Sequence, residues 1–188
     1  YLKDFKSAES KERPVYFLLK TKWHRTNAEK DSALYYFNKL EVTDNDVELK
    51  ILKFLEELYI DYQSKAAVAY DKSARIFSNI KFAEQHNSMF TFRLYREMAE
   101  AYYLNGKQQE SAHFNDLWFK NSPNKKSLWV QDSYYSNQFA IAHQLEDVGS
   151  MKVYLDKVEK VANQLNSESV TAKFHNYQAQ YHYYAKNY

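Results

Sequence analysis

The sequence contains no cysteine, only two glycines (Gly106 and Gly149) and only two prolines (Pro14 and Pro123) among 188 residues. The lack of cysteine excludes disulfides, zinc–thiolate sites and cysteine nucleophiles, and it suits reducing and oxidising compartments equally. Sheet-rich folds use glycine and proline in their many tight turns. The scarcity of both residues therefore predicts long helices joined by few connections.

Long apolar runs and strong charge are also missing. No run approaches the roughly 18–20 residues that a membrane-spanning helix requires, so we expect no membrane insertion by this region. The formal net charge of +2 is too small to predict direct contact with nucleic acid. Residues 1–30 carry a mild basic bias, which we interpret as a solvated face. Because the chain begins at Tyr1 without a signal-peptide pattern, we expect a piece of a longer protein, cytoplasmic or periplasmic.

A short sequence signature recurs at intervals close to 40 residues. The dipeptide Ser-Ala occurs at 32–33, 73–74 and 111–112, and Ser-Met follows at 150–151, so that successive starts lie 41, 38 and 39 residues apart. Each occurrence is followed by large apolar side chains at helical spacing. Such a period predicts a stack of helix pairs, in which neighbouring pairs share one continuous core.

The apolar spacing predicts nine helices after a polar lead-in over residues 1–14. We expect one repeat domain over residues 15–188, with about four and a half helix pairs and a truncated last pair. The predicted helices are 15–25, 31–40, 47–63, 65–82, 89–104, 107–120, 127–145, 150–165 and 170–186. Because the last helix lacks a partner, we expect an uncovered apolar edge around Phe174, Tyr177 and Tyr181.

The third helix pair resembles a tetratricopeptide (TPR) repeat. The matching positions are Tyr95, Met98, Ala99, Tyr102, Gly106, Ser111 and Pro123. Ala140 and Ala179 look like the small position of Ala99 in later repeats, where a small side chain permits close approach of paired helices. The resemblance implies an all-α fold, a right-handed TPR-like α-α superhelix, that is, a solenoid of antiparallel helix pairs. It also implies a concave groove that binds peptides or protein segments.

The register set by Gly106 assigns candidate binding residues to that groove. On the third pair it places Arg93, Arg96 and Tyr103 there, and its transfer through Ala140 and Ala179 adds six more. These six are Tyr134, Asn137, Gln144, Lys173, Asn176 and Tyr183. Arginine and lysine can hold a carboxylate, asparagine can bond a peptide backbone, and tyrosine offers an apolar ring with a polar tip. The alternative is that these residues are merely solvated and that Arg96 pairs with Glu100.

No catalytic, metal or cofactor motif emerges from the sequence. The six histidines form no HExxH pattern, and two isolated glycines cannot make a phosphate-binding loop. Glu56 and Glu57 are expected on an exposed face, and Trp23, Trp118 and Trp129 are expected in core or inter-repeat packing. We therefore predict a non-enzyme without catalytic residues, metal ligands or cofactors. Helical repeats can also bind RNA, but a nearly neutral chain lacks the charge for it.

These observations predict a protein- or peptide-binding scaffold. Tyr-rich TPR-like arrays of this kind are similar to the interaction or sensor modules of bacterial regulatory proteins, so we expect a larger protein with a separate output domain. The alternative is a structural or oligomerisation module whose helical faces bind a second copy of the chain, giving a homodimer.

Overall fold

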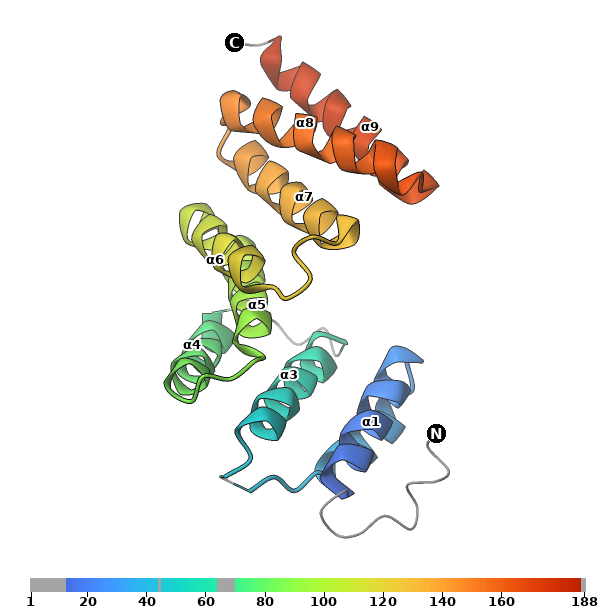
Figure 1. The fold of residues 1–188 in the computed structure, drawn as a ribbon, viewed down its shortest axis with the longest axis vertical. Helices are drawn as coiled ribbons and strands as arrows, with labels where there is room; N and C mark the ends of the chain where they lie inside the picture. Colours follow the sequence, from blue (N-terminus) through green and yellow to red (C-terminus); the bar gives the residue numbers. More distant parts are fainter. Residues whose placement is uncertain (1–12, 44, 64–69, 187–188) are drawn as a thin grey trace. The chain divides into compact units, whose positions relative to one another are not determined.

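The computed structural model describes residues 13–43, 45–63 and 70–186, and within them the chain is all-α. Nine helices lie in these residues, and no strand does, which confirms the predicted fold class at this level (Figure 1). The helices are α1 (Arg13–Thr26), α2 (Lys30–Asn38), α3 (Val47–Gln63), α4 (Tyr70–Gln85), α5 (Thr91–Leu104), α6 (Gln108–Asn121), α7 (Leu128–Gln144), α8 (Val148–Leu165) and α9 (Glu168–Ala185).

Apart from the start of the fourth helix, the predicted helix bounds differ from the observed ones by three residues or fewer, and the largest difference is the end of α4 at Gln85 instead of 82. α1 includes Arg13 and Pro14, so the helix begins two residues before the predicted start, and a proline in the first turn is well tolerated. The predicted start of the fourth helix at residue 65 and most of the lead-in 1–14 lie outside the described residues. None of the described helices is long and apolar enough to cross a lipid bilayer.

The chain divides into two compact units, residues 1–91 and residues 92–188. The first unit contains α1 to α4, and the second contains α5, which begins at the boundary, and α6 to α9. The single repeat domain over residues 15–188 stays a prediction.

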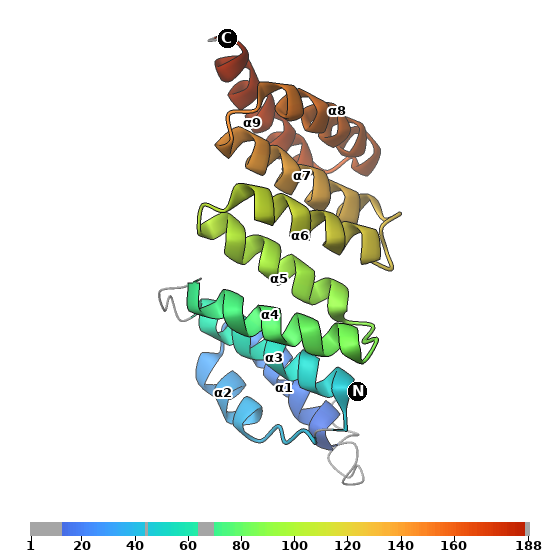
Figure 2. The ribbon, with the colours of Figure 1, turned by 90° about the vertical axis from the view of Figure 1, so that its left-hand side faces the viewer.

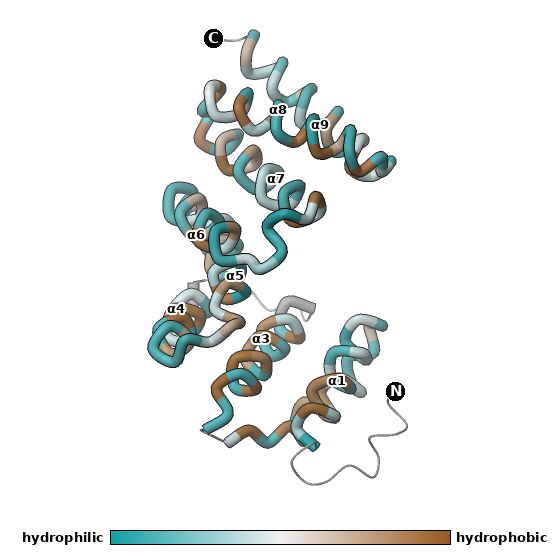
Figure 3. The backbone as a smooth tube through the Cα atoms, in the orientation of Figure 1, coloured by the Kyte–Doolittle hydropathy of each residue, from teal (hydrophilic) through white to brown (hydrophobic). Residues whose placement is uncertain are grey.

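The core of the first unit is centred on α3, where apolar side chains recur every three or four residues. Ile51, Leu55 and Leu58 are completely buried there, and Figure 3 shows the concentration of hydrophobic residues along this helix. One charged residue of α3, Glu56, lies in the core as well, with only 4% of its surface exposed. The expectation of an exposed Glu56 is therefore wrong. Arg25 of α1 neutralises this carboxylate at 2.7 Å, which makes its burial tolerable.

The core of the second unit joins α7, α8 and α9. Phe139 of α7 is buried with Met151 of α8, and α9 adds Phe174 to the same cluster. Tyr177 and Tyr181 pack against this cluster, and the Tyr177 ring stacks on Phe139 with 4.4 Å between the centroids. The expected uncovered edge around these α9 residues is therefore wrong, because they pack on side chains of α7 and α8. Figure 2 shows α9 beside α8.

A single type of turn recurs along the backbone. Ala28, Gly106 and Glu146 follow α1, α5 and α7 in left-handed conformation, with φ of 60°, 72° and 55°. In each turn, the N–H of this residue donates to the carbonyl three residues earlier, and the next N–H donates to the carbonyl five residues before it. The three residues lie 78 and 40 residues apart. Asn87 makes the same turn after α4.

The three tryptophans have different environments. Trp118 is buried as expected, but Trp23 and Trp129 are 47% and 57% exposed, so core packing is wrong for these two. Trp23 extends a solvent-facing stripe with Val15 and Leu19, one turn apart along α1. Of the three small residues, only Ala99 has the expected burial. Ala99 is buried, while Ala140 is half-buried and Ala179 is exposed.

Candidate functional site

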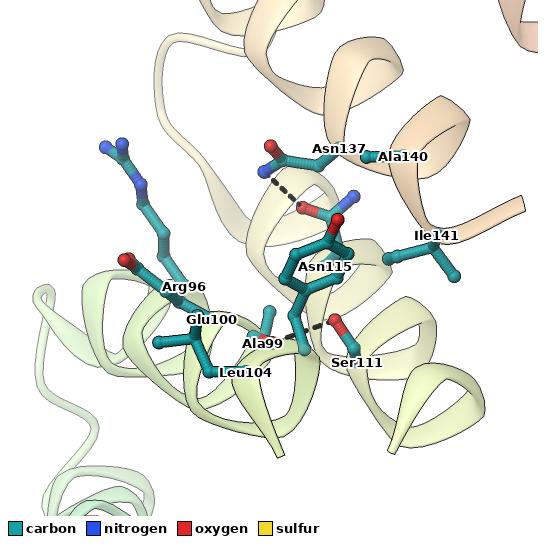
Figure 4. Close-up of a pocket in the computed structure, with 10 residues that line it drawn as sticks. Arg96, Ala99, Glu100, Leu104, Ser111, Asn115, Asn137, Ala140 and Ile141 are labelled. Atoms are coloured by element: carbon teal, nitrogen blue, oxygen red, sulfur yellow. Dashed lines mark hydrogen bonds between the residues drawn. The ribbon is translucent and has the colours of Figure 1, made fainter. Parts of the chain in front are cut away.

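The candidate site is a pocket in the second unit, where α5, α6 and α7 meet (Figure 4). Its volume is about 350 Å³. The lining residues come from all three helices and combine polar with apolar side chains. They are Arg96, Ala99, Glu100, Tyr103 and Leu104 of α5, Ser111 and Asn115 of α6, and Asn137, Ala140 and Ile141 of α7.

The wall between α5 and α6 depends on two small residues. Ser111 is buried at the start of α6, and its hydroxyl donates to the carbonyl oxygen of Ala99 at 2.8 Å. Larger side chains close the contact on either side, because the rings of Tyr95 and Tyr102 both pack against Phe114. The small side chains let the helix backbones approach each other, and the aromatic rings fix how the helices pack.

A buried amide joins α6 to α7 at the base of the pocket. Asn115 is 1% exposed, and its Nδ2 donates to the carbonyl oxygen of Tyr134 at 3.4 Å. Its own oxygen accepts from Nδ2 of Asn137 at 3.3 Å. In Figure 4 the oxygen of Asn137 points away from Asn115. Asn115 therefore orients Asn137 so that its carbonyl can accept a hydrogen bond from a ligand.

Two charged residues of opposite sign lie at one side of the pocket. Arg96 and Glu100 are both exposed and stand one turn apart on α5. The guanidinium carbon of Arg96 lies 5.6 Å from the ring centroid of Trp118 on α6. No ion pair joins Arg96 to Glu100 (Figure 4), so the predicted alternative of an Arg96–Glu100 pair is wrong. The arginine is instead oriented by a buried aromatic ring.

Three of the nine sequence-predicted binding residues line this pocket: Arg96, Tyr103 and Asn137. They come from two helices, with Arg96 and Tyr103 on α5 and Asn137 on α7. Arg93 lies on α5 outside the lining and is half-buried. Asn176 and Tyr183, both exposed, lie on α9 outside the pocket.

The other three predicted binding residues are engaged in contacts within the protein. The hydroxyl of Tyr134 donates to Asp116 at 2.7 Å, and its ring stacks on Phe119. Burial, with the nearby Asp116 carboxylate, raises the pKa of Tyr134 well above its ordinary value, so that it stays a hydrogen-bond donor. Lys173 forms an ion pair with the buried carboxylate of Asp132.

Gln144 is the last of these engaged residues. Its side-chain oxygen accepts from Nε2 of Gln108, which is buried at the start of α6. This contact links the C-terminal end of α7 to α6. For Tyr134, Lys173 and Gln144, these contacts support a role in holding the helices together.

Sequence reasoning missed Glu100, Asn115 and Ile141, although each lines the pocket. The signal for Asn115 is its spacing, since Ser111, Asn115 and Trp118 fall on one buried face of α6. A polar residue on such a face has a partner across the helix interface. The predicted groove is lined by the first helix of each pair only, so no residue of α6 is among the predicted binding residues.

The described residues contain no group of three His, Cys, Asp or Glu side chains arranged to hold a metal ion. The pocket presents hydrogen-bonding amides, one positive and one negative charge, and apolar surface.

Comparisons of this chain with protein-family models, with curated proteins and with solved structures found no match.

Proposed function

We propose that this chain is a protein- or peptide-binding scaffold and that the pocket between α5, α6 and α7 receives part of its ligand. In this proposal the helices form a TPR-like superhelix that serves as the interaction or sensor module of a larger bacterial regulatory protein. One observation carries the proposal. Arg96, Tyr103 and Asn137, selected from the sequence as groove residues, line a single pocket although they come from two helices.

The size and chemistry of the pocket suit a peptide. A volume of about 350 Å³ lies at the lower end of the range for small-molecule sites, and it accommodates a side chain with adjoining backbone. Asn137 can bond a peptide amide, while Leu104 and Ile141 offer apolar contact. Arg96 can bind a carboxylate with two parallel hydrogen bonds.

A peptide array tests this proposal directly. Fluorescently labelled protein is incubated with an array of 12-residue peptides of varied sequence, and the best binders are titrated against ¹⁵N-labelled protein. We expect the largest NMR shift changes at the backbone amides of the pocket, including those of Ser111, Asn137 and Ile141. Shift changes confined to α8 and α9 would place the binding surface elsewhere and reject this site.

A second function, self-association, is favoured by the exposed stripe on α1. Val15, Leu19 and Trp23 are 39%, 40% and 47% exposed and lie on one line along the helix. A ridge spaced by four residues packs well into a groove on another helix. We expect a homodimer formed through this stripe to be disrupted by Leu19→Glu. Sedimentation velocity measures the fraction of dimer in each variant. Val153→Glu, which also changes an exposed apolar residue, is the matched control and should leave the dimer intact.

A further inference from the structure

The two charges of the pocket are both available to a ligand. Arg96 and Glu100 are the two charged residues in the lining, and they have opposite signs. Residues four apart on a helix ordinarily attract each other when their charges are opposite, although an arginine placed before the glutamate gives the weaker order. Here the two side chains do not form an ion pair (Figure 4).

Trp118 lies beside the guanidinium of Arg96 instead. Its ring is buried on α6 and faces the guanidinium of Arg96. A guanidinium over an aromatic ring keeps the N–H groups at its edge available for hydrogen bonds to a carboxylate. Glu100 is exposed and can accept from a cationic group.

We propose that the pocket selects a peptide segment that carries one acidic and one basic side chain, two residues apart. This inference rests on the proposed peptide-binding function and specifies the ligand. The acidic side chain binds Arg96, the basic side chain binds Glu100, and Asn137 accepts from the peptide backbone.

The spacing follows from helix and strand geometry. Side chains four apart on a helix have Cβ atoms about 5–6 Å apart. In an extended peptide, side chains at alternate positions point to the same side and lie about 6.6 Å apart along the chain. A segment with a single kind of charge brings one like-charged side chain to the pocket, and like charges in contact weaken binding.

Four short peptides of one design test the charge rule. The sequences between flanking Gly-Gly pairs are Glu-Ala-Lys, Lys-Ala-Glu, Glu-Ala-Glu and Lys-Ala-Lys, with both termini blocked, and fluorescence anisotropy gives their affinities at low salt. We expect the better of the two mixed peptides to bind at least about tenfold more tightly than either singly charged peptide. The preference should shrink in high salt, because screening weakens these exposed charges.

Variants of the two residues assign each preference to its source. In Arg96→Gln the better mixed peptide should no longer bind more tightly than Lys-Ala-Lys. In Glu100→Gln it should no longer bind more tightly than Glu-Ala-Glu. Glu110→Gln is the control, because Glu110 is exposed on α6 outside the pocket lining. It should leave all four affinities unchanged.

The results separate this inference from the proposed function. Equal binding of all four peptides, with loss of affinity in Asn137→Ala, would overturn the charge rule and support peptide binding at the pocket. A tighter complex with either singly charged peptide would also overturn it. If none of the four binds, the charge rule fails, and the peptide array decides the function.

Discussion

Arg96 and Trp118 lie on successive helices, with the guanidinium carbon 5.6 Å from the centroid of the buried ring. A core residue of α6 thus sets the direction of an exposed charge on α5. Asn115 acts similarly toward Asn137, through a hydrogen bond of 3.3 Å from α7 to α6. The binding groups of the pocket are oriented by side chains that also hold the helices together, which lowers the entropy lost on binding.

Packing at Ala99 is the first property to test. Ala99 is buried where Ser111 donates to its carbonyl oxygen, and it also lines the pocket, so the ring of Ala99→Tyr presses on the close contact of α5 with α6 as well as entering the pocket. We expect the free energy of unfolding to fall by about 1–3 kcal/mol. Ala179→Tyr is the control, because Ala179 is exposed on α9, and it should change stability by less than about 0.5 kcal/mol. Urea denaturation measures the stability of both variants. If Ala99→Tyr is as stable as Ala179→Tyr, Ala99 is not at a tight contact.

The turn after α5 gives a second prediction. Gly106 has a φ of 72°, a conformation that disfavours a side chain although no atom lies within 4 Å of an added Cβ. Gly106→Ala should therefore destabilise the protein by about 1 kcal/mol through backbone strain alone. Gly149 lies in the first turn of α8, where an added Cβ would make an ordinary contact with Oδ1 of Asp147 at 3.4 Å, so Gly149→Ala should instead stabilise the protein by less than about 1 kcal/mol. Thermal unfolding compares the two, and changes of the same sign would contradict the backbone argument.

The third prediction concerns Lys173, whose contact is structural. Lys173→Met leaves the buried Asp132 carboxylate without its cationic partner, so we expect a loss of about 1–3 kcal/mol of stability. Lys152→Met breaks the exposed pair with Asp156 and should not shift the unfolding midpoint. Peptide affinity should be unchanged in Lys173→Met under conditions where it is folded. Reduced affinity with unchanged stability would return Lys173 to the binding groove.

Helix content and helix order could be predicted from local signals. The three- and four-residue spacing of Ile51, Leu55 and Leu58 indicates a helix with one buried face, and the structure buries all three. Gly106 marks a helix end, because glycine adopts the left-handed conformation without strain. Ala28 and Glu146 make the same turn without glycine, so the sequence carries no comparable signal there.

The site could be predicted only in part, because contacts between distant residues decide which polar groups remain available. Gln144 meets Gln108, which is 36 residues away, and Lys173 meets Asp132, which is 41 residues away. Helical spacing places a side chain on a face but does not identify its partner on another helix. The same limit applies to Glu56, whose burial depends on Arg25. Arg96, Tyr103 and Asn137 line the pocket. Asn137 also donates to Asn115, 22 residues away, and this distant contact uses its amide nitrogen and leaves its oxygen for a ligand.

The most direct measurement is a calorimetric titration of the best array peptide into the wild-type protein and into two arginine variants. Arg96 lines the pocket, and Arg93 lies outside the lining on the same helix. We predict that Arg96→Ala weakens binding at least about tenfold, or 1.4 kcal/mol, while Arg93→Ala binds like the wild type. Equal affinities for all three proteins, or a loss confined to Arg93→Ala, would contradict the assignment of this pocket as the peptide-binding site.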